Sequence, residues 1–226
     1  MTSPTPESVA QLISSDDYGN RLSGITKLRT LEQKTAFQLV QPLINDENAR
    51  VRYAAVSCLS SLGQVDRELS LKLLRDRLLN DSETDVKAAA ADTIGGLRLT
   101  EAYLDLDTLY HQSDEWLLQF SIVACLGELG DPRGFELLQE ALSSPVELIQ
   151  TAAIVALGEL GDTRAIPLIT SFLSHPDWQI RYRVIQALEH FDPTLGREAV
   201  EVLSQDPLEQ VAQEAQRVLQ SWQTNP

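Results

Sequence analysis

Cysteine and histidine are the side chains of this sequence that could act as nucleophiles or metal ligands. Cys58 and Cys125 stand far apart, without the CxxC spacing of a zinc or redox site. His111, His175 and His190 form no HExxH pair, so we expect no bound metal. No GxSxG, P-loop or GxGxxG motif occurs in a strand–turn–helix setting. The sequence therefore identifies no catalytic residue.

Paired aromatic residues indicate a different chemistry, the binding of a flat ligand or of a partner surface. Trp116 with Phe120, and Trp178 with Tyr182, are four residues apart, so on helices each pair would form one apolar plate. Arg183 follows Tyr182 directly and could pair with an anion. The same rings could instead cover the junction between neighbouring structural units or make ordinary protein contacts.

These residues belong to a repeat of 31 to 35 residues. The segments VRYAAVSCLSSLG, LQFSIVACLGELG, IQTAAIVALGELG and IRYRVIQALEHFD share one frame, with apolar residues at offsets 0, 4, 8 and 11 that predict a helix. A second amphipathic segment, such as FELLQEAL from Phe135, precedes each of them. The frame begins at Asn20, Val51, Val86, Leu118, Ile149, Ile180 and Val211. Seven units predict an all-α, right-handed α-solenoid of about seven short helical hairpins, forming a single domain over residues 1–226.

Glycine and aspartate residues stand between the predicted helices, as expected for the turns of helical hairpins. Gly130 and Gly161 each follow a predicted helix and precede an aspartate, which favours a left-handed helix end and then a cap. Asp46, Asp81 and Asp206 precede other second helices, and we expect them to be N-caps.

Offset +1 of the frame often carries a basic residue. Arg52 and Lys87 stand there, and we expect each to pair with the aspartate that opens its own unit, Asp46 and Asp81 respectively. Arg181 occupies the same offset. We therefore interpret these residues as structural and Arg183, at offset +3, as the better candidate for binding an anion.

Offsets −2, +2 and +9 lie opposite the apolar stripe, so they should face the inner surface of the solenoid. Glu147 and Glu189 would bring carboxylates there, for hydrogen bonding, proton transfer or simply a surface salt bridge. Glycines at offset +9 should leave space for a flat ligand; they are Gly95, Gly127 and Gly158. The predicted ligand-binding or partner-binding residues are Tyr53, Trp116, Phe120, Glu147, Trp178, Tyr182 and Arg183. Cys58 and Cys125, at offset +7, should be small core residues.

Composition limits the possible partners. The chain carries 33 acidic and 18 basic residues, a net charge of −15, which disfavours nucleic acid and anionic lipid. Apolar runs are too short to span a membrane, and the polar start Met1–Pro4 lacks the pattern of a signal peptide. We expect a cytoplasmic protein that binds proteins or small molecules.

The segments LGELGDPRGFELLQEAL and LGELGDTRAIPLITSFL, from Leu126 and Leu157, resemble the short HEAT-like repeats of phycobilisome lyases. The resemblance covers all seven units and extends to LRDRLLNDSETDVKAAAADTIGGL from Leu74 and HPDWQIRYRV from His175. Taken whole, the chain is similar to phycobilisome-degradation proteins related to CpcE/CpcF-type bilin lyases. This resemblance implies cyanobacterial phycobiliproteins such as phycocyanin as partners, and their linear tetrapyrrole, phycocyanobilin, as a possible ligand or substrate rather than a resident cofactor.

The implied function is chromophore detachment or antenna disassembly. Two alternatives stay open: a bilin lyase subunit that attaches chromophore together with a second chain, and a scaffold that binds only protein. Deoxyhypusine hydroxylase also uses short HEAT-like repeats, but its iron site depends on His-Glu dipeptides, and this sequence has none.

Overall fold

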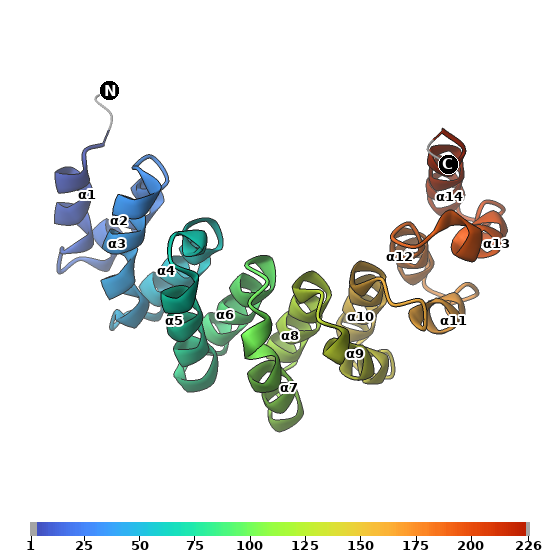
Figure 1. Ribbon diagram of the computed structural model, residues 1–226, viewed down its shortest axis with the longest axis horizontal. Coiled ribbons are helices and arrows are strands. Elements are labelled where there is room, and N and C mark those ends of the chain that lie inside the picture. Colours follow the sequence, from blue (N-terminus) through green and yellow to red (C-terminus); the bar gives the residue numbers. More distant parts are fainter. Residues whose placement is uncertain (1–3, 225–226) are drawn as a thin grey trace. The chain divides into compact units, whose positions relative to one another are not determined.

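A computed structural model describes residues 4–224; residues 1–3, which begin the polar start, and residues 225–226 lie outside it. The structure is 77% helical, and no strand occurs among the described residues. Its helices form seven successive hairpins, as Figure 1 shows. The prediction of an all-α solenoid built from helical hairpins is therefore confirmed. No helix within residues 4–224 is long and apolar enough to cross a membrane.

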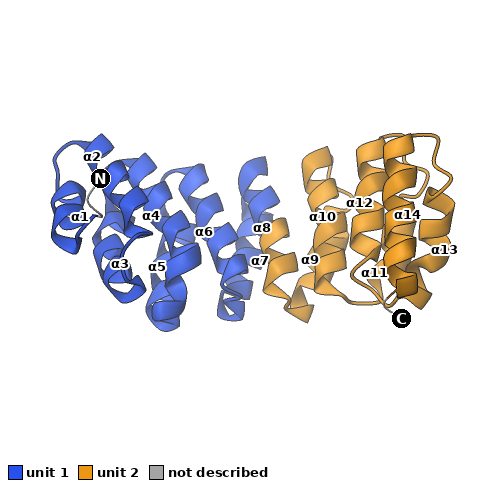
Figure 2. Cartoon of the chain, turned by 90° about the horizontal axis from the view of Figure 1, so that it is seen from above, with its two compact units in different colours: residues 1–122 blue, residues 123–226 orange. Residues whose placement is uncertain are grey.

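The chain divides into two compact units, Met1–Ile122 and Val123–Pro226, coloured separately in Figure 2. In the first unit, α2 packs on α4 and α4 on α6, while α3 and α5 cover them from the other layer. Its helices are α1 (Pro6–Ile13), α2 (Tyr18–Leu28), α3 (Gln33–Val40), α4 (Ala49–Leu62), α5 (Arg67–Asn80), α6 (Thr84–Gly96), α7 (Tyr103–Gln112) and the first half of α8 (Trp116–Leu129).

The second unit repeats this arrangement. The second helices of its hairpins pack in order, α10 on α12 and α12 on α14, and α9, α11 and α13 form the other layer. Its helices are the second half of α8, then α9 (Phe135–Ala141), α10 (Glu147–Leu160), α11 (Ala165–Thr170), α12 (Trp178–Leu188), α13 (Pro193–Leu203) and α14 (Glu209–Thr224).

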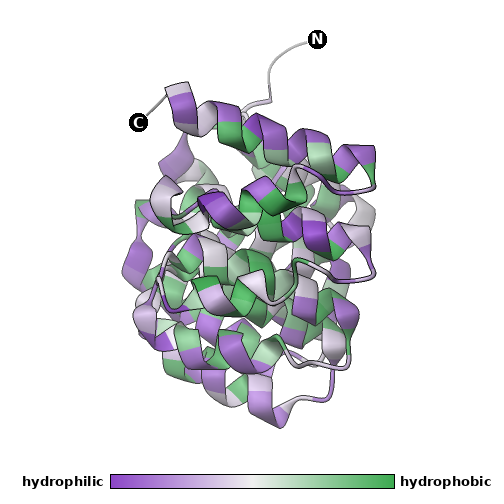
Figure 3. Cartoon of the chain, turned by 90° about the vertical axis from the view of Figure 1, so that its right-hand side faces the viewer, coloured by the Kyte–Doolittle hydropathy of each residue, from purple (hydrophilic) through white to green (hydrophobic). Residues whose placement is uncertain are grey.

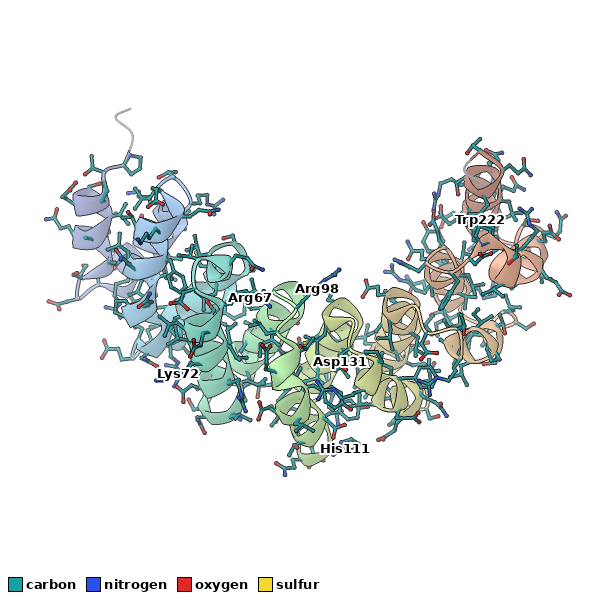
Figure 4. All side chains as sticks on the ribbon, in the orientation of Figure 1. Arg67, Lys72, Arg98, His111, Asp131 and Trp222 are labelled. Atoms are coloured by element: carbon teal, nitrogen blue, oxygen red, sulfur yellow. The ribbon has the colours of Figure 1, made fainter. Side chains whose placement is uncertain are left out.

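The core of each unit lies between its two layers of helices, where the repeat frame places its apolar stripe. The side chains at offset +8 in the first six hairpins are completely buried: Leu28, Leu59, Ile94, Leu126, Leu157 and Leu188. Figure 3 shows hydrophobic residues on the helix sides that face neighbouring helices. In the last hairpin, Leu219 is half-exposed, contrary to the predicted stripe, whereas Val218 beside it is buried; within residues 4–224 no hairpin follows α14 to cover Leu219. Trp222, labelled in Figure 4, closes this end of the core.

The turns after α8 and α10 contain the predicted left-handed glycines. Gly130 and Gly161 have φ angles of 67° and 70°, the left-handed conformation that glycine adopts without strain. The side chain of Asp131 then accepts a hydrogen bond from the Arg133 backbone N–H at 3.0 Å. Asp162 accepts the equivalent bond from Arg164 at 3.0 Å, but Arg164 is the N-cap of α11, so the cap predicted at Asp162 is wrong.

The predicted N-caps in the other turns are wrong. Asn48 is the N-cap of α4 and Glu83 that of α6, each two residues after the aspartate expected to do this. Asp46 and Asp81 instead accept hydrogen bonds from the backbone N–H groups of these two residues, at 2.9 and 3.0 Å. The carboxylates consequently fix the turn before the helix and keep an oxygen for another partner.

That partner is an arginine from the preceding hairpin. Arg21 Nε lies 2.8 Å from Asp46 Oδ2, and its Nη2 also donates to Oδ1 at 2.9 Å. Arg52 donates to both carboxylate oxygens of Asp81, from Nε and Nη2, each at 2.8 Å. In the second unit, Arg181 pairs with Asp206 at 2.6 and 2.9 Å in the same way. We call these three pairs the Arg–Asp ladder.

The ladder corrects the expected pairing within one hairpin. Arg52 contacts its own turn only through backbone carbonyls, and its Nη1 donates to the backbone carbonyl oxygen of Asp46 at 3.0 Å. Lys87 Nζ lies 3.4 Å from the Leu79 carbonyl. The structural role expected for Arg52 and Arg181 holds, but each joins two consecutive hairpins and stabilises their stacking.

Candidate functional site

The second unit contains a groove of about 780 Å³ lined by its second helices. The N-terminal halves of α10, α12 and α14 form it, so it lies within one compact unit. Its main lining residues are Glu147, Leu148, Thr151, Trp178, Tyr182, Arg183, Gln213, Glu214 and Arg217. Four of the seven predicted site residues, Glu147, Trp178, Tyr182 and Arg183, therefore share one groove.

Three side chains give the groove its apolar surface. Trp178 is 38% exposed and Leu148 is 55% exposed, an unusual degree for such large apolar groups. Tyr182 is half-buried one turn after Trp178 on α12. Asp177 begins this helix, accepting a hydrogen bond from the Gln179 N–H at 2.8 Å, and so fixes the point at which Trp178 leaves the backbone. A flat apolar ligand could lie against these side chains.

Two arginines line the groove, and their surroundings differ. Arg217 donates hydrogen bonds to Glu214 and Glu189, each at 2.8 Å. These bonds raise the pKa of its guanidinium, and the bond to Glu214 has the larger effect. Arg183 is exposed and donates only to the neutral Gln186 amide oxygen at 2.7 Å. Within residues 4–224, no carboxylate pairs with Arg183. Arg183 is therefore the groove cation that can accept an anionic ligand without losing an existing ion pair.

Two carboxylates were predicted to lie in this region, and they differ in whether an arginine already binds them. Glu147 is the first residue of α10 and is exposed. Glu189, the other predicted groove acid, is held by Arg217 instead. This leaves Glu147 as the predicted acid with access to a groove ligand.

The remaining predicted site residues lie in the first unit. Tyr53, 48% exposed, lines a separate pocket of about 220 Å³ together with Arg50, Glu83 and other residues at the N-termini of α4 and α6. Trp116 is exposed and Phe120 half-buried, one turn apart at the start of α8. The structure does not join these residues to the groove of the second unit.

The glycines at offset +9 do not open space for a ligand, contrary to the prediction. A Cβ atom on Gly158 would lie 2.6 Å from the Ala187 Cα atom, and one on Gly127 would lie 2.7 Å from the Ala156 Cα atom. Each glycine thus permits the backbones of neighbouring second helices to approach closely. Gly95 is buried as well.

The two cysteines differ in exposure. Cys125 is buried, as expected of a core residue. Cys58 is half-buried, and burial raises the pKa of its thiol, which opposes formation of the reactive thiolate. Among the described residues, no cluster of histidine, cysteine or carboxylate side chains could hold a metal ion.

Sequence reasoning missed several groove residues, including Leu148, Glu214 and Arg217. The helical wheel used three offsets opposite the apolar stripe, whereas the groove walls also use offsets −1, +3 and +6 on neighbouring helices. Leu148 carried a signal, since a leucine beside the predicted stripe, at the first turn of a helix, would be exposed.

Comparison with known proteins identifies the family. The model of the family described as HEAT repeats matches residues 5–95, 71–158, 104–189 and 136–220. Since these matches cover most of the chain, the protein belongs to the HEAT-repeat family. A comparison with curated proteins returns no match.

Several solved structures share the fold. One is the complex of CpcE and CpcF of phycocyanin lyase from Nostoc sp. PCC7120, with 20% identity, coverage of 98% of this chain and 96% of that one, and a TM-score of 0.64. The Escherichia coli protein YibA matches with 13% identity, coverage of 99% and 88%, and a TM-score of 0.63. An engineered protein matches with 17% identity, coverage of 96% and 68%, and a TM-score of 0.60. At these identities the likeness concerns the fold.

Proposed function

We propose that this HEAT-repeat protein binds a phycobiliprotein such as phycocyanin, its linear tetrapyrrole chromophore, or both, through the groove of the second unit. We further propose that it promotes chromophore detachment and antenna disassembly, like the phycobilisome-degradation protein NblB that its sequence resembles. The observation that carries the proposal is the combination, in one groove, of an exposed Trp178 and an Arg183 without a carboxylate partner.

The chemistry of a linear tetrapyrrole fits this combination. Its conjugated rings can stack on Trp178 and Tyr182, and its propionates can accept paired hydrogen bonds from Arg183. The groove volume of about 780 Å³ falls in the range of small-molecule sites, roughly 300–1,000 Å³. Breaking a thioether link to the chromophore requires a proton transfer near the linked ring, and Glu147 offers an exposed carboxylate for it.

A bilin lyase subunit is the second candidate. The observation in its favour is the fold shared with the phycocyanin lyase complex along nearly the whole of both chains. A lyase subunit of this type would need a second, related chain to attach chromophore. Activity that appears only when such a chain is added would therefore favour this candidate over detachment.

The test mixes the purified protein with phycocyanobilin and, separately, with holo-phycocyanin, while visible absorption and released pigment are followed. Wild type is compared with Trp178→Ala and Arg183→Gln. Trp116→Ala is the matched control, because Trp116 is an exposed tryptophan at the same repeat offset but belongs to the first unit.

We expect wild type to give a spectral change. Titration of this change should show an affinity about tenfold or more lower for both groove variants, as expected for a central aromatic or arginine contact. The control should retain the wild-type affinity. Equal loss in all three variants would contradict the assignment to this groove. No response in either mixture would refute pigment binding and leave a scaffold for protein contacts.

A further inference from the structure

Arg98 adopts a backbone conformation that is costly for a residue with a side chain. It follows α6 with a φ of 52° and is the non-glycine residue with positive φ within residues 4–224. At the same repeat offset, +12, the chain has Gly130 and Gly161, both left-handed. An L-residue in this conformation is strained by its Cβ atom, and such outliers tend to be kept for function.

The backbone explains why a left-handed residue is needed here, but not why it is arginine. Leu99 N–H donates to the Ile94 carbonyl at 3.1 Å, and Arg98 N–H donates to that of Gly95 at 2.8 Å. These two bonds form the usual glycine-type end of a helix, and Leu99 is buried against the core. A glycine at position 98 would make the same bonds without strain.

No contact of the Arg98 side chain within the described residues offsets the backbone strain. The side chain is exposed, and in the described residues no hydrogen bond or ion pair holds its guanidinium; Glu101, three residues later, does not pair with it. Arg67 lies beside it and donates to the carbonyls of Leu97 and Arg98, at 2.8 and 3.2 Å. Figure 4 shows Arg98 pointing away from the ribbon next to Arg67. Two arginine side chains thus lie at this helix end.

We infer that Arg98 is a docking residue that receives a carboxylate of a protein partner. A guanidinium binds a carboxylate through two parallel hydrogen bonds. Arg98 lines neither the groove of the second unit nor the pocket beside Tyr53, so a free anion would be held by little besides this side chain. A protein partner adds further contacts, whereas nucleic acid and anionic membranes are repelled by the overall negative charge.

This contact lies in the first unit and goes beyond the groove, but it rests on the proposed function for its probe, holo-phycocyanin. The first measurement needs no partner. Arg98→Gly should raise the melting temperature by about 2–4 °C, since it removes the strain and no contact. Gly161→Arg is the matched control and should lower it, because it introduces the same strain at a position with open space around the Cβ. An unchanged or lower melting temperature for Arg98→Gly would overturn the inference.

The second measurement is the affinity for holo-phycocyanin, by calorimetry at low and high salt. Arg98→Gly should weaken binding about tenfold, and Arg98→Lys should recover part of the loss because the charge is retained. If wild type and Arg98→Gly bind equally, this inference fails while the proposed function stands. If wild type does not bind at all, the proposed function fails, and the partner named here fails with it.

Discussion

The Arg–Asp ladder allows a quantitative test of how consecutive hairpins are held together. Asp81 has a completely buried side chain, and Arg52, its partner, is only 11% exposed. Asp81 accepts hydrogen bonds from Arg52 Nε and Nη2, from Arg77 and from the Glu83 backbone. Replacing Asp81 with serine removes the charge that neutralises a buried guanidinium. Such a change costs about 3–5 kcal/mol in the free energy of unfolding.

The chain itself supplies the neutral alternative. Gln119 occupies the offset of Arg52 in another unit, and Ser144 occupies the offset of Asp81 in the unit that follows it. The double variant Arg52→Gln with Asp81→Ser leaves no buried charge unpaired. We therefore expect its loss of stability to be smaller than the sum of the two single losses by about 2 kcal/mol, a coupling usual for residues in direct contact.

The assay is urea unfolding at pH 7, followed by circular dichroism, for wild type, both single variants and the double variant. Asp162→Ser is the control, since its pair with Arg164 is largely exposed and should contribute little. A loss below about 0.5 kcal/mol for Asp81→Ser, or a double variant as unstable as the sum of the singles, would refute the view that the ladder joins the hairpins.

Three further outcomes follow from the same contacts. The pKa of Asp206 is lowered by hydrogen bonds from Arg181, and that of Asp81 is lowered because its hydrogen bonds outweigh burial. The stability that these pairs contribute should therefore be complete above pH about 4 and be lost as the pH falls through the lowered pKa values of the folded protein. Urea unfolding midpoints measured from pH 7 to 2 test this. Gly158→Ala should destabilise the protein by about 1–3 kcal/mol in urea unfolding, since its Cβ would clash with the α12 backbone; added stability would contradict the close packing. Cys58 should react with a thiol reagent more slowly in the native than in the urea-unfolded protein at pH 7.5, and equal rates would contradict its burial.

The repeat frame was sufficient to predict the hairpins because each unit buries the same stripe. Leu59 and Ile94, at one offset, are completely buried in neighbouring second helices. The frame failed at Leu219, because periodic reasoning assumes a following unit and the described residues contain none after α14. The repeat pattern predicts burial for units that are covered on both sides, and burial in a terminal unit depends on which of its sides is covered.

The ladder could have been predicted from the sequence by comparing consecutive units rather than positions within one. An arginine at offset +1 occurs where the next unit has aspartate at offset −5, as in Arg52 with Asp81 and Arg181 with Asp206. Where that aspartate is absent, as after Gln119, the glutamine donates to backbone carbonyls of its own turn instead. A buried arginine and its carboxylate are only tolerated together, so the two positions change together.

The candidate groove shows why residue type alone could not separate binding from packing. Gly158 and Trp178 were both expected to serve a ligand, one by leaving space and the other by stacking. A missing Cβ serves a ligand or a neighbouring backbone equally well, and only the position of α12 shows that the backbone fills the space at Gly158. In the second unit the groove lies at the N-terminal halves of the second helices, whereas these close backbone contacts lie toward their C-terminal ends. Substitutions of groove residues at offsets −2, +2 and +3 should therefore change affinity with little effect on stability, and substitutions at offset +9 should do the opposite.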